Sequence, residues 1–199
     1  IDALATMPPE RRPALRIIGA PPPDGDAYAR TLHEAVAAAG MLGTTSFDGA
    51  LPRPILAERI RRAGLVLIPS HSETFGLVAL EAAASAVPVI ASATGGLREA
   101  VIDGQTGLLL ESDDPRVWAA AIERLLMLAP LVQAWQALRL GLGSHAELAR
   151  AAAACGVDGP PLEDRNRPPW GLPCPSLDEL IRIAADHWPA VGMDGPDIV

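Results

Sequence analysis

Two glutamates, Glu73 and Glu81, lie in the short segment SETFGLVALEA, residues 72–82, where most of the other side chains are small or apolar. A charged group in such surroundings is costly unless it has a partner or a function. Carboxylates are poor ligands for phosphate, but they are good acceptors for the paired hydroxyls of a sugar. The two residues therefore favour a site that binds a hydroxyl-rich molecule.

A strand, a loop and a helix must position these glutamates. The run LVLIP, residues 65–69, predicts a strand, and residues 75–85 predict a helix. Ligands of open parallel sheets bind at the carboxyl ends of the strands. At the start of the helix, the N–H groups of Gly76, Leu77 and Val78 would be free to hold an anion, and Gly76 would let it approach the backbone. A site that holds an anion by the backbone and hydroxyls by two flanking carboxylates is suited to a nucleotide sugar.

The rest of the pattern predicts an α/β fold with a Rossmann-like, doubly wound parallel sheet. Short apolar runs alternate with helical segments between residues 15 and 128, as in βαβ units. The central runs are almost wholly apolar, which is typical of strands covered on both faces. Strands are predicted at residues 15–19, 45–47, 65–69, 88–92 and 107–110, and further helices at 26–40, 53–64 and from Pro115 onward.

The last third of the chain differs in composition from the first two thirds. Residues 1–128 form the predicted Rossmann-like domain, whereas residues 129–199 read as a helical and irregular, proline-rich extension. Its connector VDGPPLEDRNRPPWGLPCP is too rich in proline for regular structure. A final helix is predicted from Ser176, which forms a capping box with Glu179.

The composition excludes several other classes of function. The 199 residues carry a formal net charge of -8, which would repel the phosphate backbone of a nucleic acid. All 16 basic residues are arginine, so a phosphate-loop NTPase, which needs a lysine, is excluded. Cys155 and Cys174 form no Cys-x-x-Cys pair and no histidine cluster surrounds them, so we predict no metal site.

The sequence predicts neither a signal peptide nor a transmembrane helix. The first residues show neither a basic segment nor an apolar stretch typical of a signal peptide. No apolar run reaches the roughly 18 residues that a transmembrane helix needs. We therefore expect a cytoplasmic protein without a transmembrane segment.

The longer segment around the glutamates, PSHSETFGLVALEAAASAVPVIASATGGLREAV, resembles the donor-binding core of the retaining GT-B glycosyltransferases. This group, which includes sucrose-synthase-like and mannosyltransferase-like enzymes, is marked by two glutamates separated by seven residues. The double glycine Gly95 and Gly96, the following Glu99 and the run DGQTGLLL continue the resemblance, which covers about residues 15–128. Within the group, the chain is most similar to actinobacterial enzymes that transfer N-acetylglucosamine to inositol phosphate.

The resemblance implies transfer of a hexosyl group from a UDP- or GDP-linked sugar to a small-molecule or glycan acceptor, with retention of configuration and without a cofactor. Glu73 would be the catalytic residue, contacting the donor sugar near the reacting centre, and Glu81 would accept the ribose hydroxyls. Further donor-binding positions implied by the resemblance are Phe75, Gly76, Leu77, Val78, Gly95 and Gly96.

The resemblance also implies that parts of the enzyme lie outside this chain. An N-terminal domain would hold the acceptor, and the first strand of the C-terminal domain would carry an arginine and a lysine for the donor diphosphate. Arg98 is the nearest substitute for that pair. Two alternatives stay open: a non-catalytic or degenerate nucleotide-sugar-binding domain, and a glycoside hydrolase that uses Glu73 and Glu81 as its paired carboxylates.

Overall fold

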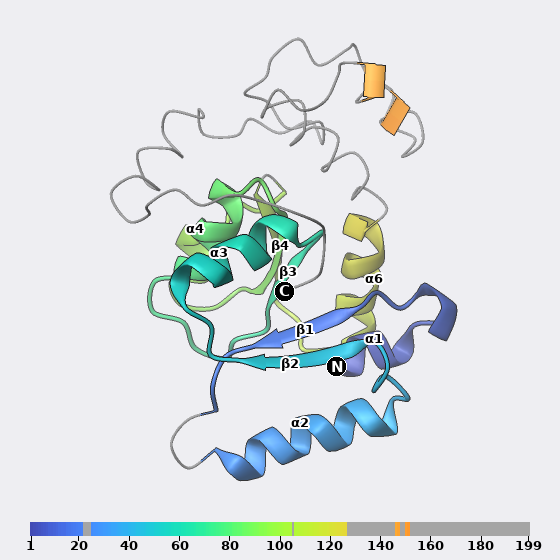
Figure 1. Ribbon diagram of the computed structural model, residues 1–199. Helices are drawn as coiled ribbons and strands as arrows, with labels where there is room; N and C mark the ends of the chain where they lie inside the picture. The colour runs from blue at the N-terminus through green and yellow to red at the C-terminus, as the bar shows by residue number, and fades with distance from the viewer. Residues whose placement is uncertain (22–24, 105, 127–145, 148–149, 152–199) are drawn as a thin grey trace.

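The computed structural model describes residues 1–21, 25–104, 106–126, 146–147 and 150–151 (Figure 1). The proline-dense connector and the capping box predicted at Ser176 lie outside these described residues. Within them, no helix is long and apolar enough to cross a membrane.

All five predicted strands form, and every strand pair is parallel. The strands are β1 (Leu15–Ile18), β2 (Thr45–Gly49), β3 (Val66–Ile68), β4 (Val89–Ser92) and β5 (Gly107–Leu110). The predicted helices are α2 (Asp26–Ala38), α3 (Arg53–Arg62), α4 (Leu77–Ala84) and α6 (Pro115–Leu126). Three short helical segments were not predicted: α1 (Asp2–Thr6), the 3-10 helix η1 (Pro9–Arg11) and α5 (Leu97–Ala100). The α/β class predicted from the alternating pattern is confirmed.

The strands divide between two hydrogen-bonded sheets, which differs from the single sheet expected from the sequence. One sheet has the order β1-β2, and the other has the order β3-β4-β5. In the second sheet Val66 pairs with Val89 and Ile68 with Ala91, so the middle strand β4 is hydrogen-bonded on both sides. Consequently β1 and β3 are both edge strands among the described residues.

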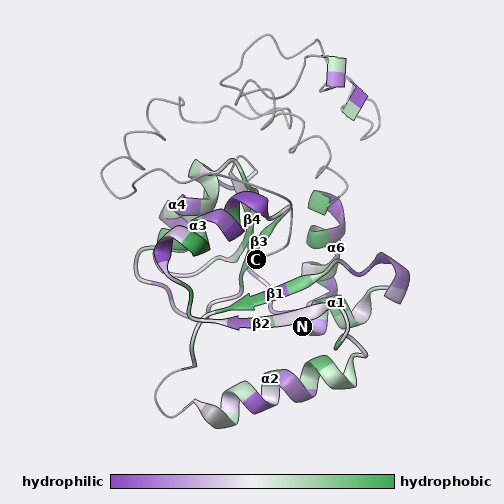
Figure 2. Cartoon of the chain, viewed as in Figure 1, coloured by the Kyte–Doolittle hydropathy of each residue, from purple (hydrophilic) through white to green (hydrophobic). Residues whose placement is uncertain are grey.

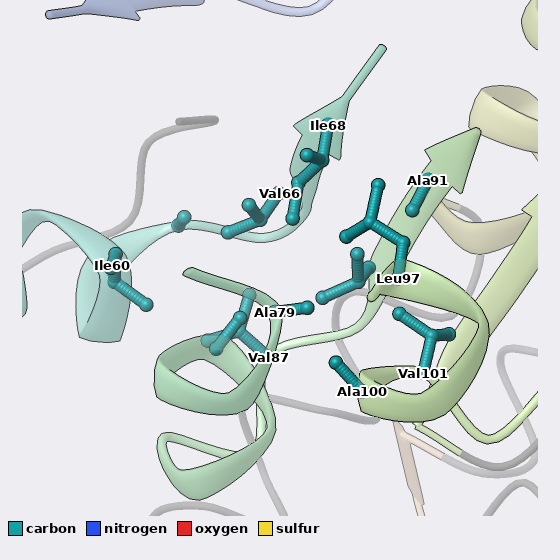
Figure 3. Packing of buried hydrophobic residues seen from close by; sticks show 12 residues of the cluster. Ile60, Val66, Ile68, Ala79, Val87, Ala91, Leu97, Ala100 and Val101 are labelled. Carbon is teal, nitrogen blue, oxygen red and sulfur yellow. The ribbon is translucent and has the colours of Figure 1, made fainter. Parts of the chain in front are cut away.

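Two apolar cores cover opposite faces of the strands. The first lies between α1, α2, α6 and both sheets, and includes Leu15, Leu65, Ile90 and Ile122. The second lies between α3, α4, α5 and the three-stranded sheet, and its members include Val66, Ala91 and Leu97, as Figure 3 shows. In Figure 2, β1 is coloured largely as hydrophobic and α3 mostly as hydrophilic. The strands β3 and β4 are therefore apolar on both faces because each face meets a layer of helices.

The end of α4 holds a residue other than glycine in the left-handed conformation. Ala86 has a φ of 56°. Its N–H donates to the carbonyl of Ala83 at 2.9 Å, and the N–H of Val87 donates to the carbonyl of Ala82 at 2.9 Å. This pair of bonds is the Schellman motif, in which glycine is the usual residue because a Cβ crowds the backbone there. The methyl group of Ala86 therefore strains the turn that leads into β4.

Replacing Ala86→Gly should raise the free energy of unfolding by about 0.5–1 kcal/mol, measured by urea denaturation. The change removes a left-handed strain of about 1–2 kcal/mol and adds a glycine entropy cost of about 0.5–1 kcal/mol. Ala37→Gly, at an exposed position within α2, is the matched control and should lower the stability by about 1 kcal/mol. A loss of stability in both variants would contradict the prediction.

Candidate functional site

The loop between β3 and α4 carries the first glutamate and ends at a glycine that no other residue can replace easily. Gly76 precedes α4 with φ 65° and ψ 33°, in the left-handed region. A Cβ added there would lie 2.7 Å from the Cβ of Ala100 in α5. Gly76 thus ends the loop abruptly, so that α4 begins at Leu77 instead of at the predicted residue 75.

The carboxylate of Glu73 turns back onto the backbone of its own loop. Its Oε1 accepts hydrogen bonds from the N–H groups of Thr74 at 2.9 Å, Phe75 at 3.3 Å and Gly76 at 3.3 Å. The bonds from Phe75 and Gly76, and then that from Thr74, lower the pKa of Glu73. The expectation that the N–H of Gly76 is free for a ligand is therefore wrong, because the side chain of Glu73 occupies it.

Two of the three predicted anion donors are still available at the start of α4. The N–H groups of Leu77 and Val78 have no hydrogen-bond partner among the described residues, whereas the N–H of Ala79 already donates to the carbonyl of Gly76. The helix dipole adds partial positive charge at this end. The side chains of Phe75, Leu77 and Val78 are 70%, 49% and 39% exposed, so the donors are surrounded by uncovered apolar surface.

The double glycine packs directly against the Glu73 loop. The N–H of Gly96 donates to the carbonyl of Glu73 at 2.8 Å. A Cβ on Gly95 would collide with the Glu73 carbonyl oxygen, and one on Gly96 would lie 2.6 Å from the carbonyl carbon of Thr74. Gly95 also has a φ of 47°, in the left-handed region. The glycines are therefore needed because two backbones approach each other without room for side chains.

A second contact, which the sequence did not single out, joins the same two loops. The hydroxyl of Thr94 donates to the carbonyl of His71 at 3.2 Å. The only sequence signal for this role is that a small polar residue directly precedes the double glycine. His71 contributes its backbone to this contact.

Glu81 is in a different electrostatic state from Glu73. It is half-buried on α4, and its Oε2 is buried without a hydrogen-bond partner among the described residues. Burial raises the pKa of Glu81, and the positive charge of Arg53 opposes that rise. A buried acceptor without a partner costs about 1–3 kcal/mol. A ligand hydroxyl that donated to Oε2 would recover part of that cost.

Arg98, the suggested substitute for the basic residues of the family, already has a partner. Its two terminal nitrogens donate to the two carboxylate oxygens of Glu111 at 2.9 and 2.8 Å. This forked geometry is the strongest form of an arginine–carboxylate contact, although the pair is exposed. A diphosphate would have to compete with Glu111 for the guanidinium group.

Comparison with known proteins identifies the family of this chain. The model of the family described as "Glycosyl transferases group 1" matches residues 1–137. The chain belongs to this family. Membership of the glycosyl transferases group 1 confirms the resemblance carried by the segment around Glu73 and Glu81.

Curated relatives and solved structures agree with the family. The D-inositol 3-phosphate glycosyltransferase of Thermomonospora curvata is 40% identical over 127 residues, which are 61% of this chain and 30% of that protein. Sucrose-phosphate synthase from Thermosynechococcus elongatus superposes with a TM-score of 0.59 at 33% identity, covering 76% of this chain and 41% of that one. HepE of Anabaena, solved in complex with UDP, gives 0.55 at 26% identity, with 78% and 43% covered.

This chain matches only part of the length of each of these relatives. It spans about 30% of the length of the Thermomonospora curvata protein. The two solved structures likewise extend well beyond the superposed region.

Gly96→Ala should lower the free energy of unfolding by about 1–3 kcal/mol, because the new Cβ forces the two loops apart. Gly43→Ala is the control, since a Cβ there meets nothing within 4 Å, and its effect should stay within about 0.5 kcal/mol. Chemical denaturation of both variants measures the difference. Equal losses in the two variants would show that the loop contact is not the cause.

Glu81→Gln should raise the melting temperature at pH 7. Because the folded-state pKa of Glu81 lies above its unfolded value, the stability gained from its protonated form is present at low pH and is lost as the pH rises through the folded-state pKa. Glutamine cannot ionise, so the advantage of the variant should grow from pH 4 to pH 7 in thermal denaturation.

The control for this pH dependence is Glu34→Gln, on the exposed surface of α2. This variant measures the general effect of replacing an exposed glutamate by glutamine, and the advantage of Glu81→Gln at pH 7 should exceed it. A Glu81→Gln advantage that does not change with pH would mean that burial of the charge is not its origin.

Proposed function

We propose that this chain is the donor-binding part of a glycosyltransferase that transfers a hexosyl group from a nucleoside diphosphate sugar, with retention of configuration. The observation that carries the proposal is the buried Oε2 of Glu81, on the same helix as the N–H groups of Leu77 and Val78. None of the three has a hydrogen-bond partner among the described residues. One helix thus combines an acceptor for hydroxyls with donors for an anion, which is the combination that a nucleotide sugar requires.

In this proposal the diphosphate lies at the N-terminal end of α4. The N–H groups of Leu77 and Val78 donate to its oxygens, and the helix dipole stabilises its negative charge. Such preorganised donors also stabilise the additional charge that develops when the diphosphate leaves the sugar. The apolar side chains beside them, including Phe75, would shield these bonds from water and so strengthen them.

Glu81 accepts the hydroxyls of the ribose, and Glu73 stands beside the donor sugar as the catalytic residue. Glu73 is held in its ionised form by three backbone N–H groups, so it can accept from a sugar hydroxyl with its second oxygen, Oε2. A carboxylate at this place would also favour positive charge that develops on the anomeric carbon. Gly95 and Gly96 position the Glu73 loop through the close contact between the two backbones.

One relative supports the choice of nucleotide in this proposal, and another supports the choice of acceptor. The complex of HepE with UDP supports UDP as the nucleotide. The name of the Thermomonospora curvata relative supports an inositol phosphate as the acceptor. The acceptor would be held by a domain outside this chain, and the reaction would take place in the cytoplasm. Residues 1–128 form the donor domain in this proposal.

Calorimetry with UDP, GDP and their glucose conjugates tests the proposal. We expect binding of UDP-glucose to the chain, and about 10-fold weaker binding to Glu81→Gln, because the amide oxygen of glutamine still accepts a hydrogen bond and only the advantage of a charged acceptor, roughly 1–1.5 kcal/mol, is lost. Glu34→Gln should bind like the unchanged chain.

Absence of binding by a folded chain, or equal affinity in Glu81→Gln, would contradict the proposal. Binding without transfer, after the acceptor domain is restored, would favour the non-catalytic alternative. Hydrolysis of a chromogenic glycoside in the absence of any nucleotide would instead favour the glycoside hydrolase alternative.

A further inference from the structure

One continuous run of backbone donors is divided between Glu73 and the position proposed for the diphosphate. Oε1 of Glu73 accepts from three consecutive N–H groups, the last of which belongs to Gly76. The next two N–H groups, those of Leu77 and Val78, have no hydrogen-bond partner among the described residues. Because consecutive Cα atoms are only about 3.8 Å apart, an anion held by these two donors would lie close to the Glu73 carboxylate.

Contacts between backbones hold the Glu73 loop in this place. The N–H of Gly96 donates to the carbonyl of Glu73 at 2.8 Å. The hydroxyl of Thr94 donates to the carbonyl of His71 at 3.2 Å. Neither contact uses the side chain of Glu73, so a substitution at this position leaves both of them in place.

The Glu73 carboxylate is not neutralised by a cation from the described residues. None of their arginines forms a salt bridge with it. Arg98, on the neighbouring α5, is already paired with Glu111. The backbone donors that bind Oε1 favour the ionised form of Glu73. A negative charge therefore stands beside N–H groups that could hold a second anion.

This charge affects two kinds of ligand differently. Two negative charges a few ångströms apart repel each other even in water, so a diphosphate at Leu77 and Val78 is opposed by Glu73. A sugar attached to the diphosphate brings hydroxyl groups, which can donate to the carboxylate in charge-assisted hydrogen bonds. The sugar thus offsets a repulsion that a free nucleoside diphosphate meets in full.

We propose that Glu73 makes the site selective for a nucleoside diphosphate that carries a sugar over the free nucleoside diphosphate. This inference rests on the proposed function and adds discrimination between the donor and the product. Once the sugar has been transferred, its hydroxyl donors leave the carboxylate, and the diphosphate then faces an uncompensated negative charge. Glu73 therefore also favours release of the nucleoside diphosphate after transfer.

Glu73→Gln separates the charge from the hydrogen bonds, because the amide oxygen of glutamine can still accept from the three N–H groups. We expect this variant to bind inorganic pyrophosphate about fivefold more tightly than the unchanged chain, because the repulsion is lost. Shifts of the amide NMR signals of Leu77 and Val78 during a titration measure the affinity at these donors. Glu34→Gln, which makes the same change in net charge on the exposed surface of α2, should bind like the unchanged chain.

Calorimetry with UDP and UDP-glucose tests the selectivity itself. The preference for UDP-glucose over UDP should fall about tenfold in Glu73→Gln, because UDP gains affinity while the sugar loses a charged acceptor. Glu81→Gln is the matched control. It changes the proposed ribose contact, which both ligands share, so it should weaken both and leave the preference unchanged. If Glu73→Gln does not fold, Glu73→Ser is a second neutral variant with an oxygen of the kind that caps helices.

Three results would overturn the proposal. The first is pyrophosphate affinity at Leu77 and Val78 that does not rise in a folded neutral variant of Glu73. The second is an equal rise in Glu34→Gln, which would assign the effect to net charge. The third is an unchanged preference for UDP-glucose over UDP. Failure of the proposed function is recognised separately, as absence of both UDP and UDP-glucose binding in every folded variant, and the pyrophosphate titration still decides then whether Glu73 repels an anion.

Discussion

The close approach of two loop backbones is the constraint on which the site depends. The N–H of Gly96 donates to the carbonyl of Glu73, and neither Gly95 nor Gly96 has space for a Cβ against that loop. This contact fixes the Glu73 loop at the carboxyl end of β3. Only with the loop so placed does the Glu73 carboxylate reach three consecutive N–H groups before α4. The lowering of the pKa of Glu73 by these N–H groups therefore depends on the glycine packing that places the loop.

The two glutamates show how one segment produces opposite electrostatic environments. Backbone donors lower the pKa of Glu73, whereas burial on α4 raises the pKa of Glu81. Among the described residues, Oε2 of Glu81 has no donor. An unsatisfied buried acceptor lowers stability unless a ligand donates to it. In the proposed complex, a nucleotide sugar would donate to Oε2 of Glu81 and would accept from the N–H groups of Leu77 and Val78, which have no hydrogen-bond partner among the described residues.

The division of the strands has a separate origin from the site. The three-stranded sheet, from which the Glu73 loop and α4 extend, is covered by helices on both faces. The two-stranded sheet depends on the core that it shares with α1, α2 and α6. Apolar contacts join the two sheets in one core, while no backbone pairing links β1 to β3 among the residues that the structure describes.

The sequence alone determined the α/β class, the five parallel strands, four of the helices and the family, because alternation of apolar runs and the segment around Glu73 and Glu81 are properties of neighbouring residues. It could not predict that Glu73 would occupy the N–H of Gly76, that Oε2 of Glu81 would be unpartnered, or that Arg98 would pair with Glu111. These features were decided by the tertiary structure, since hydrogen-bond partners and burial depend on segments brought together from different loops and helices.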